Sequence, residues 1–325
     1  MTYDRILLDS ANLFYRLKKN LRTSLEIVKR MINYTEGEIK SRLKKDGIVY
    51  ILFDPVSYSD LGESKNFYFS INERKKILSD YKANRIYSNL YLETIELYRK
   101  YYIYRGDQIK LIYSDEHEAD DYVEPLIKSF NGEKSVAIVT TDYDLAGYMS
   151  DKPKIHMINE GWDKPFTSAD FEKLFQFKPT PGANILYKSL FGDKSDNIVG
   201  AIFMKKAKFN MNVKLLCRDY LKYVADNNLT IDEITKEFKT GNFQESTKRQ
   251  TKTPFDALFL ALSIVDLKVP IMEKLYTNIR VIRSSLTDKT IEPFIHCNAE
   301  NATINDVIHK AIFGQPFSNT FGKVK

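Results

Sequence analysis

The sequence predicts an α/β fold, in which a central, mostly parallel sheet is flanked by helices and followed by a mainly helical C-terminal lobe. Three apolar segments of strand length each end on an aspartate, and they run from Tyr3 to Asp9, from Val49 to Asp54 and from Val136 to Asp142. Unbroken runs of Val, Ile and Leu are typical of strands buried on both faces, as in a parallel sheet covered by helices. Ligands bind outside the carboxyl ends of such strands, so we expect the three aspartates to lie there together.

Further acidic residues fall in two short motifs. The segment from Asp115 to Glu124 contains six carboxylates and no Lys or Arg, although the whole chain has a net charge of +6. A second motif, from Gly192 to Asn197, contains Asp193 and Asp196. A solvated helix start explains one acidic run, because Asp and Glu are favoured in the first turn of a helix. It does not explain the aspartates at the strand ends, since clustered carboxylates raise each other's pKa and destabilise a fold.

Divalent cations remove this repulsion. Mg²⁺ takes oxygen ligands in octahedral geometry and keeps several waters, so a shared site needs many carboxylates and no His or Cys. The four histidines are scattered and have no spacing typical of zinc ligands. The sequence therefore predicts a metal site built from carboxylates, and the candidates are Asp9, Asp54, Glu118, Asp120, Asp121, Asp142, Asp144, Asp193 and Asp196.

These motifs resemble those of the phage and bacterial 5′-nuclease family, which comprises flap endonucleases and 5′-3′ exonucleases with a PIN-like catalytic domain. The resemblance covers residues 3 to 200, with the motifs in the family's order. It rests on the strand ends at Asp9 and Asp54 and on four motifs, which are Tyr81-Lys82-Ala83-Asn84-Arg85, Glu118-Ala119-Asp120-Asp121, Thr141-Asp142-Tyr143-Asp144-Leu145 and Gly192-Asp193-Lys194-Ser195-Asp196-Asn197-Ile198. Each motif alone is weakly specific, but their combination is highly specific.

The resemblance implies metal-dependent hydrolysis of phosphodiester bonds near free 5′ ends of DNA, as in primer or flap removal during replication and repair. It implies two Mg²⁺ ions, for which Mn²⁺ can substitute. Lys82 and Arg85 correspond to catalytic residues that contact the phosphate, and Tyr81 to a residue that stacks on DNA bases. The expected ligands are Glu118, Asp120 and Asp142 for one ion, Asp144, Asp193 and Asp196 for the other, and Asp9 and Asp54 partly through water.

The resemblance also divides the chain into a catalytic domain, residues 1–178, and a helical DNA-binding lobe, residues 179–325. In the family this lobe contains a helix-three-turn-helix element, whose Gly-hydrophobic-Gly hairpin approaches the phosphates of duplex DNA. Here the segment that starts at Gly200 lacks the second and third glycines. The basic residues that follow still predict contacts with a duplex backbone, and they are Lys205, Lys206 and Lys208.

The remaining elements follow from periodicity. Residues 13–45 and 90–104 have helical patterns, and residues 62–70, which lose periodicity, predict a loop or arch. Six basic residues between Lys65 and Arg85 interleave with aromatic ones. This pattern alone favours a basic amphipathic helix that packs its Tyr inward, whereas the family motif at residues 81–85 favours a surface for single-stranded DNA. Pro125 lacks the N–H for the carbonyl of Asp121, so we expect a kink or a helix that starts later than Glu118.

Composition excludes other classes of protein. The two cysteines form no CxxC, no apolar run is long enough to span a bilayer, and the N-terminus is a strand rather than a signal peptide. A pI near 8.9 favours polyanionic partners. We therefore expect a cytoplasmic monomer, in a bacterium or a phage-infected host, that binds no membrane. Its expected partner is DNA with a 5′ flap or free 5′ end, or an RNA–DNA primer junction, and the sequence identifies no replication protein that it contacts.

Two alternatives stay open. A ribonuclease with the same carboxylates would act on RNA or RNA–DNA primers and would cleave an RNA strand faster than a DNA flap. A non-catalytic protein that binds DNA structures would share the fold. The complete set of carboxylates argues against this second alternative, because a protein without catalysis is expected to lose some of them.

Overall fold

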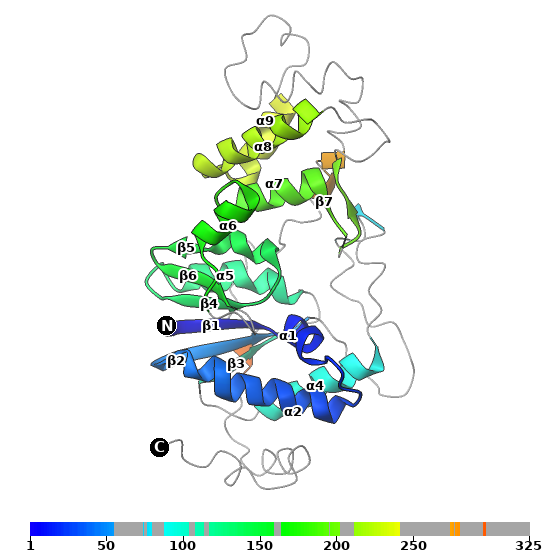
Figure 1. The fold of residues 1–325 in the computed structure, drawn as a ribbon, viewed down its shortest axis with the longest axis vertical. Coiled ribbons are helices and arrows are strands. Elements are labelled where there is room, and N and C mark those ends of the chain that lie inside the picture. Colours follow the sequence, from blue (N-terminus) through cyan, green and yellow to red (C-terminus); the bar gives the residue numbers. More distant parts are fainter. Residues whose placement is uncertain are drawn as a thin grey trace, which may run out of the picture.

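The computed structural model describes residues 1–54, 74, 77–79, 88–103, 108–113, 117–158, 164–194, 196–201, 211–240, 274, 275, 277–279, 295 and 296. Over these residues the fold is α/β, which confirms the predicted class. A seven-stranded sheet lies at its centre, in the order β5-β6-β4-β1-β2-β3-β9 (Figure 1). None of the described helices is both long and apolar enough to cross a membrane.

The five inner strands of the sheet pair in parallel, whereas β5 and β9 pair antiparallel at its two edges. Their bounds are β1 (Tyr3–Asp9), β2 (Leu43–Leu52), β3 (Ile109–Ile112), β4 (Val136–Val139), β5 (Ser150–Asp151), β6 (Lys154–Ile158) and β9 (Ile295–His296). Because β4, β1 and β2 are adjacent and parallel, their carboxyl ends share one edge of the sheet.

Helices cover both faces of the sheet. In Figure 1, α2 and α4 lie along one face, α5 lies on the other, and α6 to α9 extend away from the sheet on the side of α5. The bounds are α1 (Ser10–Leu17), α2 (Ser24–Tyr34), the π-helix η1 (Thr35–Ile39), α4 (Asn89–Ile103), the 3₁₀ helix η2 (Ala119–Tyr122), α5 (Val123–Ser129), the 3₁₀ helix η3 (Tyr143–Tyr148), α6 (Ser168–Phe175), α7 (Pro181–Phe191), α8 (Met211–Asp226) and α9 (Ile231–Thr240).

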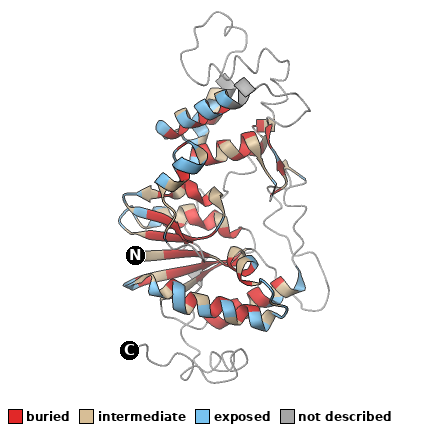
Figure 2. Ribbon diagram, viewed as in Figure 1, coloured by how far each residue is buried: buried red, intermediate tan, exposed pale blue. Residues whose placement is uncertain are grey.

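Strand β1 shows how the two faces form two hydrophobic cores. Ile6 and Leu8 pack into the core that includes α1, α2 and α4, whereas Leu7 packs into the core that includes α5, α7 and α8. All three side chains are fully buried, and buried residues run through the middle of the sheet in Figure 2. Burial on both faces requires consecutive apolar residues, and the run from Ile6 to Leu8 supplies them. This run explains why the sequence predicted the strand.

Some predicted boundaries shift in the structure. Strand β2 begins at Leu43, so the helical pattern predicted for residues 13–45 is wrong at its C-terminal end. The first residues of this strand are mostly exposed and polar, and they therefore carry no apolar signal. Helix α4 confirms the helix predicted for residues 90–104, and α5 begins after the acidic motif with Pro125 in its first turn, as expected.

A short hairpin of β7 (Gly192–Asp193) and β8 (Ile198–Val199) follows α7. Its two ends touch: a Cβ on Gly200 would lie 2.4 Å from the carbonyl carbon of Phe191, and one on Gly192 would lie 2.5 Å from the nitrogen of Gly200. Gly192 also has a φ of +85°, a conformation that disfavours other residues. The glycines therefore allow the hairpin to fold tightly against the end of α7.

A residue far along the chain fixes this hairpin. Asn278 is fully buried, and its side-chain amide donates hydrogen bonds to the carbonyl oxygens of Ser189 at 3.0 Å and Val199 at 2.9 Å. The sequence suggested no role for this part of the chain, where it predicted only a core helix at residues 255–267, outside the described residues. The division into domains at residue 178 stays a prediction.

We expect Gly200→Ala to lower the free energy of unfolding by about 1–3 kcal/mol, because the added methyl group overlaps backbone atoms that cannot move independently. Gly37→Ala is the matched control, since Gly37 lies in a helix and an added Cβ would have no heavy atom within 4 Å. This second change should leave stability unchanged or raise it slightly. Urea denaturation measures both, and equal effects of the two substitutions would contradict the tight closure of the hairpin.

Candidate metal centre

Three aspartates lie just beyond neighbouring strand ends, and backbone amides hold each of them. Asp9 accepts from the N–H of Asn12 at 2.9 Å. Asp54 accepts from the N–H of Ala119 at 3.0 Å. Asp142 accepts from the N–H of Asp144 at 3.0 Å as the N-cap of η3. These bonds fix the carboxylates at one edge of the sheet, where the sequence predicted that they would meet.

Glu118, Asp120 and Asp121 form the first carboxylate cluster, in which one oxygen of each residue lies within 4.8 Å of the others. The 3₁₀ helix η2 brings them together, and the N–H of Glu118 donates to Asp121 at 3.1 Å. Arg74 forms ion pairs with both Glu118 and Asp121, the latter at 2.5 Å. Asp120 Oδ1 is buried and has no hydrogen-bond partner. A buried carboxylate oxygen without a donor is costly, so it suits a cation.

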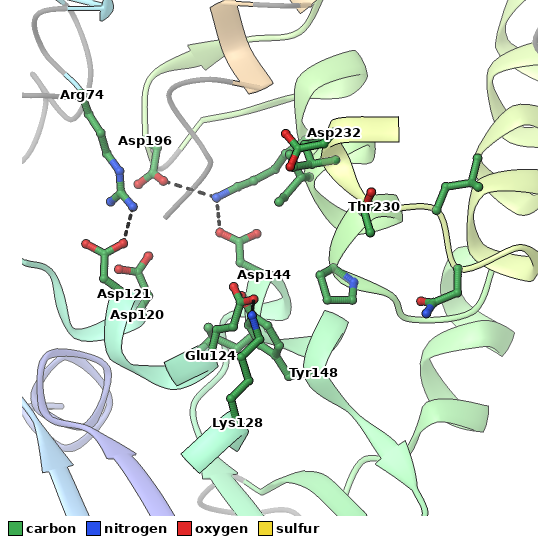
Figure 3. A pocket seen from close by; sticks show the side chains of 18 residues that line it. Arg74, Asp120, Asp121, Glu124, Lys128, Asp144, Tyr148, Asp196, Thr230 and Asp232 are labelled. Atoms are coloured by element: carbon green, nitrogen blue, oxygen red, sulfur yellow. Dashed lines mark hydrogen bonds and ion pairs between the residues drawn. The ribbon is translucent and has the colours of Figure 1, made fainter. Parts of the chain in front are cut away.

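Asp144, Asp193 and Asp196 form the second carboxylate cluster, again with oxygens within 4.8 Å of one another. They come from η3 and from the β7–β8 hairpin. Lys188 of α7 is buried among them, and its Nζ lies 2.7 Å from Asp193, 3.3 Å from Asp196 and in direct contact with Asp144. Figure 3 shows the ion pairs to Asp144 and Asp196 as dashed lines, with Arg74 and Asp121 across the pocket.

Burial, together with the neighbouring charges, shifts the pKa of several of these groups. Burial and the charge of Asp54 raise the pKa of Asp9 to about 7. Burial raises the pKa of Asp121 to about 7 despite Arg74, and that of Asp144 to about 8 despite Lys188. For Lys188, burial lowers the pKa, but the surrounding carboxylates outweigh it and raise the pKa well above its usual value. The lysine therefore stays charged.

The clusters differ in membership from the expected ligand sets. Asp121, rather than Asp142, groups with Glu118 and Asp120. Burial raises the pKa of Asp142, and Lys188 lowers it in part. Asp120 of the first cluster and Asp196 of the second both raise it further, so Asp142 interacts with both clusters. The assignment of individual ligands stays a prediction. The other predicted site residues lie outside the described residues, and they are Tyr81, Lys82, Arg85, Lys205, Lys206 and Lys208.

The sequence did not single out the two cations that pair with the carboxylate clusters. Arg74 was one of several basic residues expected on a DNA-binding surface, but it pairs with the first carboxylate cluster instead. Lys188 carried only a weak signal, as a basic residue in a helix that is otherwise mostly apolar. Its spacing from Asp193 along the sequence does not predict their ion pair, because the turn of the chain into the β7–β8 hairpin brings the two side chains together.

A cavity of about 440 Å³ separates the two clusters (Figure 3). Arg74, Asp120 and Asp121 line it on one side, and Asp144, Lys188 and Asp196 on another. The cavity continues past Tyr148 toward the start of α9. It therefore opens two carboxylates of each cluster, and both cations, to a bound molecule.

We expect Asp9→Asn to stabilise the metal-free protein increasingly as pH rises. In the folded protein the pKa of this carboxyl is about 7, so the folded state is favoured only while the carboxyl is protonated. Its contribution to the free energy of unfolding is therefore present below the unfolded pKa of about 4 and is lost as pH rises through the folded pKa. The asparagine variant should gain on the order of a few kcal/mol relative to wild type between pH 5 and pH 8. Urea denaturation in EDTA measures this, with the exposed Asp219→Asn as control, and a pH-independent difference would contradict it.

Comparison with known proteins gives a local sequence match. A Bacillus subtilis (strain 168) protein named 5′-3′ exonuclease is 30% identical over 133 residues, which are 39% of this chain and 43% of that protein. The match thus spans less than half of either protein. No family model matches the chain.

Two solved structures share the fold over almost the whole chain. One is a T5 protein co-crystallized with metal ions, with a TM-score of 0.53, and the other is T5 5′-exonuclease with divalent metal ions (zinc) bound, with a TM-score of 0.51. Each is 15% identical and covers 95% of this chain and 98% of its own. The local sequence match and the shared fold confirm the resemblance of this chain to the 5′-nuclease family with its PIN-like fold.

Proposed function

We propose that this chain is a metal-dependent 5′-nuclease, which hydrolyses phosphodiester bonds near free 5′ ends of DNA as a 5′-3′ exonuclease or flap endonuclease. The observation that carries the proposal is the placement of two carboxylate clusters around one cavity of about 440 Å³. Such paired carboxylate sites hold two cations in many phosphodiester hydrolases. The name of the Bacillus relative and the metal ions in the T5 structures support the same activity.

The donors fit a hard divalent cation, and we propose two Mg²⁺ ions, with Mn²⁺ able to substitute. Each cluster offers three carboxylates and no His or Cys, which suits Mg²⁺ better than softer metals. The buried, unpaired Oδ1 of Asp120 is a ready ligand atom. When bound, the ions supply an activated water and stabilise the leaving oxygen.

The chain's own residues prepare this site. The backbone amides that hold Asp9, Asp54 and Asp142 fix these carboxylates before substrate arrives, so little reorganisation is needed. Lys188 keeps its proton because carboxylates surround it. It lines the cavity while its ammonium group pairs with three carboxylates, so its positive charge, rather than a free N–H, would help to stabilise a phosphate held there.

Residues outside the described ranges complete the proposal on the basis of the family resemblance. Lys82 and Arg85 would stabilise charge on the scissile phosphate, and Tyr81 would stack on a base. Lys205, Lys206 and Lys208 would hold the duplex backbone. The proposed substrates are DNA with a 5′ flap or free 5′ end and RNA–DNA primer junctions, processed by a monomer during replication or repair.

The test is incubation of the purified protein with 5′-flap, nicked, blunt and RNA-primed duplexes, in Mg²⁺ and in EDTA. We expect cleavage near the 5′ end of DNA flaps in Mg²⁺ and none in EDTA. Faster cleavage of the RNA strand would favour a ribonuclease. Binding of flaps without cleavage, in Mg²⁺ or Mn²⁺, would show a structure-binding protein and overturn the proposal.

We expect Asp193→Asn and Asp142→Asn each to abolish cleavage at ordinary Mg²⁺ concentrations and to leave DNA binding within a few fold, because each removes a ligand charge but no basic contact. Asp219→Asn removes the same charge from an exposed position on α8 and should cleave like wild type. Single-turnover cleavage and DNA-binding titrations measure the two effects. Substantial turnover by both cluster variants would remove the basis for the metal assignment.

A further inference from the structure

A second cavity, of about 300 Å³, adjoins the metal centre. Asp144 and Lys188 line both cavities, so their ion pair lies between the two. Asp142 and Asp193 add to the charged wall of the smaller cavity. The opposite wall is aromatic and consists of Tyr143, Phe171, Phe175 and Tyr187.

Phe175 lies at the centre of the aromatic wall. Its ring centroid is 4.4 Å from that of Phe171 in a stacked arrangement, 5.4 Å from that of Tyr143 and 5.7 Å from that of Tyr187. Phe171 is buried and supports the others from behind, whereas the other three rings are only half-buried. The wall thus presents partly exposed aromatic rings on a buried aromatic base.

This arrangement is unlike a section of ordinary core. Rings in a close-packed interior leave few voids larger than a water molecule, whereas this pocket of about 300 Å³ opens to solvent and is lined by partly exposed rings from η3, α6 and α7. A pocket that combines apolar rings with a few convergent polar groups is typical of a ligand site. A flat apolar group suits the rings, and an anionic group suits the charged wall once cations neutralise its carboxylates.

We propose that this aromatic pocket receives the base of one of the two nucleotides that flank the scissile phosphate. The inference rests on the proposed nuclease function, since a nucleotide places its base on one side of the sugar and its phosphate on the other. The base would stack on Phe175 and Tyr187, while the phosphate would lie across the Asp144–Lys188 pair in the larger cavity. Aromatic rings stack on any base, because every base has an apolar face.

Several polar groups of the pocket already have hydrogen-bond partners. Asn184 lines it, and its side-chain NH₂ group donates to the carbonyl oxygens of Tyr143 at 3.1 Å and Asp144 at 3.3 Å. Thr141 Oγ1 accepts from Asn12 at 2.7 Å. Asn184 Oδ1 is buried and has no hydrogen-bond partner, so a base edge can donate to it while the rings stack on the base.

The first test compares single-turnover cleavage of a natural flap with that of flaps that carry an abasic site at either flanking nucleotide. In wild type, one abasic position should slow cleavage or weaken binding by about tenfold, within the range measured for base–aromatic stacking. Phe175→Leu and, independently, Tyr187→Leu should impose a similar loss on the natural flap. On the flap that is abasic at the sensitive position, the same two substitutions should slow cleavage or weaken binding little further.

Phe166→Leu is the matched control. Its ring centroid lies 5.4 Å from that of Tyr143, but it does not line the pocket. It should keep the wild-type difference between natural and abasic flaps. Thermal unfolding checks that the variants fold, and the independent Tyr187→Leu variant carries the test if Phe175→Leu does not.

A second readout needs no metal. With 2-aminopurine at the sensitive position, binding in EDTA should change its fluorescence for wild type and Phe166→Leu but not for Phe175→Leu or Tyr187→Leu. Cleavage of natural flaps with no effect of abasic sites or pocket variants would overturn the inference and leave the nuclease function standing. A pocket-dependent fluorescence change without any cleavage in Mg²⁺ or Mn²⁺ would instead support the pocket and overturn the nuclease function.

Discussion

The structure depends on one electrostatic constraint: two carboxylate clusters and three further aspartates lie within a small volume at one edge of the sheet. Two like charges about 4 Å apart repel by about 4 kcal/mol at an effective dielectric of about 20. The protein meets part of this cost with its own cations, Arg74 in the first cluster and Lys188 in the second. Burial is the largest effect on the pKa of Asp9, Asp121 and Asp144, and neighbouring carboxylates raise it further. A divalent cation would favour the charged form of these groups.

Topology assembles this centre from separate parts of the chain. The parallel order of β4, β1 and β2 brings Asp142, Asp9 and Asp54 to the same edge. The second cluster needs a different device, because Asp193 and Asp196 belong to a hairpin outside the main sheet. Two features hold this hairpin against α7, which supplies Lys188. One is the close approach of Gly192 and Gly200 to each other, and the other is the pair of hydrogen bonds that the side-chain amide of Asn278 donates. Packing in the helical part of the molecule therefore positions half of the candidate metal centre.

The sequence predicted those features whose causes are local. Strand β1 has an apolar run, Ile6 to Leu8, because both faces of the sheet are buried there, and the aspartate that follows this run was therefore recognisable. The start of β2 was not, because its first residues are exposed and polar. Arg74 and Lys188 were missed for a different reason. A buried basic residue is recognisable only by its acidic partners, and these lie between five and forty-seven positions away along the chain.

The alternation of charged and aromatic residues in two short segments has a common geometric cause. Asp142, Tyr143 and Asp144 are consecutive at the start of η3, and Tyr187 precedes Lys188 in α7. Neighbouring side chains of a helix point in different directions, so each segment contributes both to the charged centre and to the aromatic pocket. The Asp144–Lys188 pair then separates a cavity lined by carboxylates and cations from one with an aromatic wall. A substrate that spans both would present an anionic group to the charged centre and a flat apolar group to the rings, and a nucleotide has both parts.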